Sequence, residues 1–187
     1  MRITSGKYRG LVLDVVIADT TRQTMDKIRL SVLNTLNSIA LKENLYFNRC
    51  LDLFAGSGAF GLDMHSRFGV KLILNDNGAE AFNIIKNNLI KMHLDAISTV
   101  EIYNLDYDVL LDKLITSRQK VDVVFLDPPY TKYDYNLIVK KIKAILDKKA
   151  IIICESLDSF IFLEDDDFIK YKEMKFGNKK LTYFLFR

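Results

Sequence analysis

Residues 49–76 contain residue types whose spacing is typical of ligand chemistry. They read RCLDLFAGSGAFGLDMHSRFGVKLILND, which predicts a strand, a glycine turn, a helix and a second strand ending at Asp76. Gly56 and Gly58 lack a Cβ, so the chain can turn sharply and a ligand can approach its backbone. The free N–H groups of the following helix could meet a carboxylate or a phosphate. Asp76 is an acceptor-only carboxylate that suits the hydroxyls of a ribose, so the stretch predicts a nucleoside site.

The glycine spacing alone does not decide between ligand classes, because dinucleotide enzymes also use GxGxxG, here Gly56, Gly58 and Gly61. Gly61 falls in the first helical turn, where a small residue permits close packing on the strand. Asp52 lies inside the first strand, where a buried charge requires a partner. Downstream, residues 121–130 read VDVVFLDPPY, an apolar strand that ends at Asp127. The charge of Asp52 inside a strand, and the strand that ends at Asp127, both favour a ligand other than a dinucleotide.

With both stretches considered, the chain resembles class I S-adenosylmethionine-dependent methyltransferases. DxFAGSGxxG, starting at Asp52, is similar to their cofactor loop, and DPPY to the signature of enzymes that methylate exocyclic amino groups of nucleobases. More narrowly, the chain resembles the bacterial 16S rRNA guanine-N2 methyltransferase family of the guanine 966 type. That likeness rests on MRITSGKYRG, TRQTMDKIRLSVLNTL, CES at residues 154–156 and KFGNKKLTYFLF. The sequence departs from the family at Gln23, Leu30, Leu33 and Gly78.

The resemblance implies a Rossmann-like α/β fold, with a seven-stranded, mainly parallel sheet, an antiparallel C-terminal hairpin strand and a small N-terminal β-hairpin arm. It implies S-adenosylmethionine as cofactor and 16S rRNA within the small ribosomal subunit as partner. The expected cofactor-binding residues are Asp52, Phe54, Ala55, Gly56, Ser57, Gly58, Gly61, Asp76, Asn77, Asp106, Tyr107 and Thr24. The expected RNA-binding residues are Arg2, Lys7, Tyr8, Arg9, Arg22 and Arg29. The expected catalytic residues are Asp127, Pro128, Pro129 and Tyr130.

The DPPY stretch has the groups that attack by an exocyclic amine needs. Such an amine is a poor nucleophile, because its lone pair is delocalised into the base. Asp127 and the carbonyl of Pro128 could accept a hydrogen bond from its N–H, and the two prolines stiffen the loop. Tyr130 offers a flat face on which an unstacked base could stack. The alternative interpretation is a rigid strand-to-loop turn, since Pro-Pro commonly marks loops.

Composition bounds the remaining possibilities. The chain of 187 residues fits one domain, and its net charge of +3 is too small to prove nucleic-acid binding. Cys50 and Cys154 fall in predicted core strands and are expected to be buried thiols. The spacing of His and Cys predicts no metal site. Without an apolar leader or a membrane-length apolar run, we expect a soluble, cytoplasmic protein, and we expect a monomer.

The N-terminal residues are predicted to form strands at 2–5 and 11–15, joined by a turn that contains Lys7, Tyr8 and Arg9. The turn could meet RNA phosphates and stack a base, or it could be a solvated hairpin tip. We expect residues 1–20 to form an appended arm and residues 21–187 the methyltransferase domain. A helix is predicted at 24–41, with Thr24 as N-cap and its apolar stripe in the core. Its basic residues could face the mouth of the site or be surface charges.

The rest of the chain alternates helices and strands. Helices are predicted at 59–67, 78–92, 107–115 and 133–146, with strands at 98–103, 121–126, 150–154, 168–174 and 181–186. Asp106 could accept a hydrogen bond from an adenine, cap the helix at 107, or do both. If the sheet is parallel, Gly56, Asp76, Asp106 and Asp127 all come to its carboxyl edge, where ligands of such folds bind.

Three other functions remain open. A DNA adenine-N6 or cytosine-N4 methyltransferase would use the same chemistry, but such enzymes usually need a large recognition domain. Methylation of a protein glutamine would favour Asn in place of Asp127. A catalytically silent RNA-binding protein could keep the fold, although the intact cofactor residues argue against it.

Overall fold

The computed structural model describes residues 1–16, 22–96, 98–129 and 133–187, and for residues 22–25 only the backbone. Its helices are α1 (Arg22–Glu43), α2 (Ala59–Phe68), α3 (Ala79–Lys91), α4 (Tyr107–Thr116) and α5 (Tyr135–Ile142), followed by a short 3-10 helix, η1 (Lys143–Ile145). Its strands are β1 (Arg49–Asp52), β2 (Lys71–Asn75), β3 (Val100–Tyr103), β4 (Val121–Leu126), β5 (Leu146–Leu157), β6 (Phe168–Phe176) and β7 (Lys179–Phe186). Within the described residues, no helix combines the length and apolar character needed to cross a membrane.

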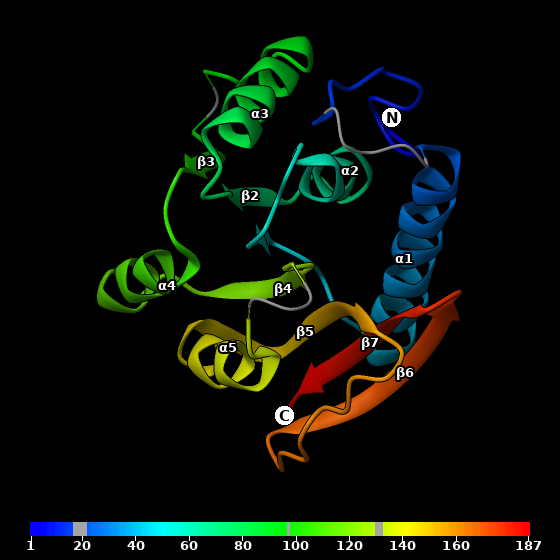
Figure 1. Ribbon diagram of the computed structural model, residues 1–187, viewed down its shortest axis with the longest axis vertical. Helices are drawn as coiled ribbons and strands as arrows, with labels where there is room; N and C mark the ends of the chain where they lie inside the picture. Colours follow the sequence, from blue (N-terminus) through cyan, green and yellow to red (C-terminus); the bar gives the residue numbers. More distant parts are fainter. Residues whose placement is uncertain (17–21, 97, 130–132) are drawn as a thin grey trace.

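The seven strands form one sheet in the order β3-β2-β1-β4-β5-β7-β6 (Figure 1). The first five are parallel, β7 runs antiparallel to β5, and β6 runs antiparallel to β7. The predicted seven-stranded, mainly parallel sheet with a C-terminal antiparallel hairpin is therefore confirmed. The order reverses between β1 and β4, and at such a point loops diverge and leave room for a ligand.

Helices cover both faces of the sheet. One core cluster joins α1, α2 and α3 to the strand residues Cys50, Leu72 and Phe125, and a second joins α4 and α5 to Leu51 and Val124. Because successive side chains of a strand point to opposite faces, a strand covered on both sides is apolar throughout. This explains why β4 coincides with the predicted strand at 121–126. Cys50 and Cys154 are buried thiols, as expected.

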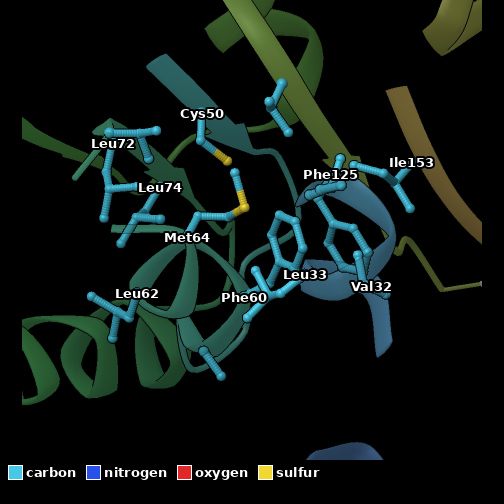
Figure 2. Packing of buried hydrophobic residues seen from close by; sticks show 14 of the residues in the cluster. Val32, Leu33, Cys50, Phe60, Leu62, Met64, Leu72, Leu74, Phe125 and Ile153 are labelled. Atoms are coloured by element: carbon cyan, nitrogen blue, oxygen red, sulfur yellow. The ribbon is translucent and has the colours of Figure 1, made fainter. Parts of the chain in front are cut away.

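Packing within the first cluster fixes the glycine turn relative to the end of β4. Phe60, in the first turn of α2, stacks on Phe125 of β4 with ring centroids 4.0 Å apart. Figure 2 shows both rings beside Val32 and Leu33 of α1, with Met64 of α2 beneath Cys50. The start of α2 is thus held against Phe125, which lies two residues before Asp127 in the sequence.

The predicted helix at 133–146 is wrong in its last turn. Helix α5 ends at Ile142, η1 follows, and β5 begins at Leu146 rather than at residue 150. Between the pairs Val121↔Leu146 and Val123↔Ile151 the register shifts, and Lys149 has φ of 60°. The polar residues 147–149 are therefore an irregularity inside a strand, which local sequence does not distinguish from a loop.

The predicted N-terminal hairpin is also different from expected. In place of two strands there is a single bridge, Arg2↔Val12, with backbone hydrogen bonds on either side of it. Met1, Ile3 and Leu13 are buried in the first core cluster, so these residues pack on the body of the protein. The expected boundary at residue 20 lies outside the described residues.

The segment contacts α2 very closely at Gly6. Its φ is +82°, and a Cβ there would lie 1.9 Å from the carbonyl oxygen of Ser66. The backbone N–H of Lys7 donates to the same oxygen at 2.8 Å, and the N–H of Tyr8 donates to Ser66 Oγ at 3.0 Å. Glycine is needed here because the two backbones touch.

Candidate active site at the carboxyl edge of the sheet

A cavity of about 700 Å³ lies where the carboxyl ends of β1, β4 and β5 meet α1 and the β6–β7 hairpin. Ligand pockets typically have this size. Polar or charged residues of its wall are Arg29, Asp52, Ser57, Asp127, Glu155, Lys179 and Lys180, and apolar ones include Met1, Ile28, Phe54, Phe60, Phe125 and Phe176.

The glycine turn has the conformation that its sequence predicts. Gly56 and Gly58 have φ of +55° and +77°, in the left-handed region that side chains disfavour. A Cβ on Gly56 would meet no atom within 4 Å, so its backbone faces open space. Gly61 is required for packing, because a Cβ there would lie 2.3 Å from Leu74 Cδ2. The close approach of α2 to the sheet is thus confirmed.

Asp52 has the partner that its position in the strand requires. It is 1 % exposed, and its Oδ2 accepts a hydrogen bond of 3.1 Å from the backbone N–H of Gly61. Burial raises the pKa of Asp52 to about 7, the Gly61 N–H opposes that rise, and the Asp76 carboxylate adds to it. The carboxyl group therefore titrates near neutral pH in the wall of the cavity.

Asp76 joins the glycine turn to the start of α3. Its Oδ2 accepts from the N–H of Gly56 at 2.9 Å, and its Oδ1 accepts from the N–H of Gly78 at 2.8 Å. Each oxygen of a carboxylate has two acceptor sites, so both can still accept from a ligand hydroxyl. Asn77, the next residue, is exposed.

Asn75 is a structural residue of this edge that the sequence analysis missed. Its amide donates to the carbonyls of Leu53 and Leu105, both at 3.1 Å, and its Oδ1 accepts from the N–H of Leu105 at 3.2 Å. It thereby ties together the loops after β1 and β3. The signal in the sequence was an amide in an otherwise apolar strand.

Asp106 caps α4, as one interpretation of the sequence expected. Its Oδ1 accepts from the N–H of Asp108 at 3.0 Å. The following residue, Tyr107, belongs to a group of three rings with Phe54 and Tyr133, whose centroids are 5.2–5.7 Å apart. The rings connect the loops after β1 and β3 to the residues that follow β4.

Asp127 follows β4 directly and lines the cavity. It is partly buried, Pro128 is buried and Pro129 is exposed, while Tyr130 lies outside the described residues. In the next strand the equivalent position is Glu155, which the sequence analysis did not select. Glu155 Oε1 lies 2.8 Å from Lys179 Nζ, and Tyr135 Oη donates to the carbonyl of Glu155 at 2.7 Å.

The β6–β7 hairpin is a wall of the site that the sequence analysis assigned only to the fold. Phe176, Gly177, Lys179, Lys180 and Leu181 line the cavity. Their position follows from the insertion of β7 beside β5, which is a long-range pairing without a local sequence signal.

The expected RNA-binding residues do not form one group. Arg29 is 7 % exposed: its Nε forms an ion pair with Asp63 at 2.8 Å, and its Nη2 donates to the Arg2 carbonyl at 2.6 Å. Although it lines the cavity, its charge is therefore engaged within the fold. Arg2, Lys7 and Arg9 are exposed, and Tyr8 is half-buried against His65. The side chains of Arg22 and Thr24 lie outside the described residues.

The part of the chain that the structure describes holds no group of three or more His, Cys, Asp or Glu that could bind a metal ion. What the cavity offers instead is three carboxyl groups, Asp52, Asp127 and Glu155, at the ends of three adjacent strands. Such a wall can accept hydrogen bonds from amino groups and can stabilise a positive charge.

Comparison with known proteins gives a consistent result. Residues 1–185 match the family model described as "Conserved hypothetical protein 95". The chain is 32 % identical over 171 residues to "Putative rRNA methyltransferase YlbH" of Bacillus subtilis, covering 90 % of this chain and 80 % of that protein. It is 26 % identical over 192 residues to "Ribosomal RNA small subunit methyltransferase D" of Buchnera aphidicola subsp. Baizongia pistaciae, covering 100 % and 91 %.

Among solved structures, "Putative methyltransferase yhhF from Escherichia coli" superposes with a TM-score of 0.81 at 22 % identity, covering 100 % of this chain and 98 % of the other. At that identity the likeness concerns the fold. Fold, cavity and sequence matches all agree with the resemblance inferred from the sequence, and the chain belongs to the Conserved hypothetical protein 95 family, whose relatives here are named as methyltransferases of ribosomal RNA.

Proposed function

We propose that this protein transfers a methyl group from S-adenosylmethionine to the exocyclic N2 of a guanine in 16S rRNA, in the small subunit or an assembly intermediate. One observation supports this most strongly. The glycine turn and Asp127 line one cavity, and Asp76 is hydrogen-bonded to that same turn. A nucleoside cofactor and a target amine would therefore meet there.

The residues present fit S-adenosylmethionine. The open backbone face of Gly56 leaves room for a ligand, and Asp76 beside it can accept from ribose hydroxyls. Asp106 follows β3 and retains acceptor capacity for an adenine amino group. Asp52, Phe54 and Ser57 line the cavity near the turn, where the amino-acid end of the cofactor would lie. When bound, the cofactor supplies a methyl group activated by its positively charged sulfur.

The chain's own contribution is to hold and orient the target amine. Asp127 and the carbonyl of Pro128 accept hydrogen bonds from N2–H, which lets the nitrogen become pyramidal and direct its lone pair at the methyl group. The prolines present no N–H donors, so the loop favours an amino group over a carbonyl. Positioning in line with the sulfur carries much of the rate enhancement.

The target guanine must leave its stack to reach this cavity, so a loop or helix-end nucleotide is the expected substrate. Arg2, Lys7 and Arg9 are exposed residues outside the cavity wall and would contact rRNA phosphates. The ring of Tyr8 is half-buried, so it offers less surface for stacking than an exposed ring would. We assign the reaction to the cytoplasm, where small subunits assemble, and to a monomer.

The test uses purified protein, labelled S-adenosylmethionine and small subunits from cells that lack the gene. After digestion of the RNA to nucleosides, mass spectrometry is expected to find N2-methylguanosine. A different methylated nucleoside would overturn the substrate assignment. Absence of both transfer and cofactor binding in calorimetric titration would favour a silent RNA-binding protein.

A further inference from the structure

Glu155 and Asp127 occupy equivalent positions on neighbouring strands. The register of the parallel pair β4 and β5 aligns Leu126 with Cys154, so the next residues, Asp127 and Glu155, follow side by side. Neighbouring strands lie about 4.8 Å apart, and both residues line the same cavity. Two carboxylates therefore lie next to each other where the target base would enter.

Contacts on two sides hold Glu155 in place. Tyr135, 1 % exposed and packed against Phe160 and Phe162, donates from Oη to the Glu155 carbonyl. Lys179 Nζ donates to Oε1 at 2.8 Å, which favours one orientation of the carboxylate. A carboxylate has about four acceptor sites. Such a group can therefore accept from a ligand as well as from protein groups.

The ion pair is not needed to hold the hairpin to the sheet. Strands β5 and β7 already pair from Ile151↔Leu185 to Leu157↔Lys179. The Lys179 side chain is 42 % exposed, and a pair exposed to this degree adds little to stability. Its placement in the cavity wall is better explained by a role toward a ligand.

The Watson–Crick edge of guanine presents two neighbouring donors, N1–H and N2–H2. Adenine and cytosine present an unprotonated ring nitrogen beside their amino group. A carboxylate next to Asp127 would accept from N1–H of guanine but would face a lone pair in the other two bases. An unpaired buried acceptor is costly, so such a site discriminates strongly.

We infer that Glu155 is a specificity-determining residue that accepts N1–H of the target guanine while Asp127 accepts N2–H. This inference rests on the proposed function. It gives Lys179 the role of a positioning residue that orients Glu155, and it accounts for the two adjacent carboxylates in the cavity wall.

The test replaces the target guanine by 2-aminopurine, which keeps the 2-amino group but has an unprotonated N1. Small subunits are reassembled with 16S rRNA whose target-containing segment is synthetic, and kcat/KM is measured for both bases. The protein as it stands is expected to prefer guanine by about 100-fold, the discrimination that a lost hydrogen bond to a charged group gives. In Glu155→Gln the amide can donate to N1, so the preference is expected to fall to about 3-fold or less.

Two control variants separate this role from a structural one. Glu101→Gln changes a partly buried carboxylate on β3 that accepts from Tyr103 Oη at 2.7 Å, outside the cavity wall, and should keep the guanine preference. Lys179→Met retains the Glu155 carboxylate but removes the group that orients it, so its guanine preference should lie between those of the unaltered protein and Glu155→Gln, with a higher KM.

The inference would be overturned if Glu155→Gln lowered kcat/KM equally for guanine and 2-aminopurine, or lowered it for neither base. So would a collapse of the preference in Lys179→Met to the level of Glu155→Gln. If the unaltered protein does not methylate guanine, the proposed function itself has failed, which is a separate result.

Discussion

Asp52 and Asp63 are two buried aspartates of the same strand-turn-helix unit, and their surroundings differ sharply. Asp63 is 0 % exposed, and its carboxylate accepts from Thr4 N at 2.7 Å, Thr4 Oγ1 at 3.0 Å and Arg29 Nε at 2.8 Å. Asp52 is 1 % exposed, accepts from the Gly61 N–H, and lines the cavity. The cost of burial is largely offset at Asp63 and much less so at Asp52.

The difference separates carboxylates that hold the fold from those that face a ligand. Arg29 and Asp63 tie α1 and the N-terminal segment to α2, although burial still raises the pKa of Asp63 and Arg29 opposes that rise. Asp52 and Asp127, at the ends of the neighbouring strands β1 and β4, line the cavity where the proposed ligand would bind. A carboxyl group whose pKa is raised by burial, as at Asp52, is a frequent property of functional sites.

The largest effect is expected at Asp127, which by this comparison contributes to turnover and little to stability. Asp127→Ala should lower kcat by about 10³-fold, because the amine loses its main acceptor. The dissociation constant for S-adenosylmethionine should change little in calorimetric titration. Unchanged turnover would remove Asp127 from the reaction.

Asp63→Ala should show the opposite pattern, with a loss of about 3–5 kcal/mol in the free energy of unfolding, because buried Arg29 loses its buried partner and keeps only the more exposed Asp26. Urea denaturation measures it. The double variant Arg29→Met, Asp63→Leu should be less destabilised than Asp63→Ala, since no buried charge remains. A loss below about 1 kcal/mol in the single variant would show that the pair does not hold the fold.

Asp76→Ala tests a carboxylate that serves both purposes in the proposed function, because it braces the glycine turn and would accept from the cofactor's ribose. We expect the dissociation constant for S-adenosylmethionine to rise about 10- to 100-fold, equivalent to about 1.4–2.7 kcal/mol. Asp112→Ala, at an exposed position of α4, is the matched control. If the dissociation constant were unchanged in Asp76→Ala, the assignment of Asp76 to the ribose would be wrong.

The smallest effect concerns pH and Asp52. Because burial raises its pKa to about 7, the group is neutral below that pH and negative above it. A cationic cofactor favours the ionised form, so its affinity should fall as pH drops through 7, by at most tenfold per unit. Asp52→Asn should flatten the dependence. A constant affinity between about pH 5.5 and 8 in the unaltered protein would contradict it.

The parts of the site that depend on local sequence were predictable. The left-handed Gly56 and Gly58, the close packing at Gly61 and the cap at Asp106 each follow from neighbouring residues and the geometry of a turn or helix start. The parallel sheet was predictable because strands covered on both faces are continuously apolar, as β4 is.

The parts that depend on distant pairing were not predictable. Lys179 joins the cavity only because β7 inserts beside β5, and Glu155 only because β5 pairs with β4. From the sequence alone, Arg29 could be a surface charge of α1, because its partner Asp63 is known only once α2 is packed against α1. Residues 147–149 look like a loop, because an irregular strand shows no alternation of polar and apolar residues.

The cavity is walled by the first and the last segments of the chain, Met1 at one side and residues 176–181 at the other. Contacts between residues so distant in sequence form late, since a large loop must close before they stabilise the structure. During refolding we therefore expect secondary structure to return first and cofactor binding to lag behind it. A chain with an intact β1–β4 sheet but an undocked C-terminal hairpin would look folded and be inactive.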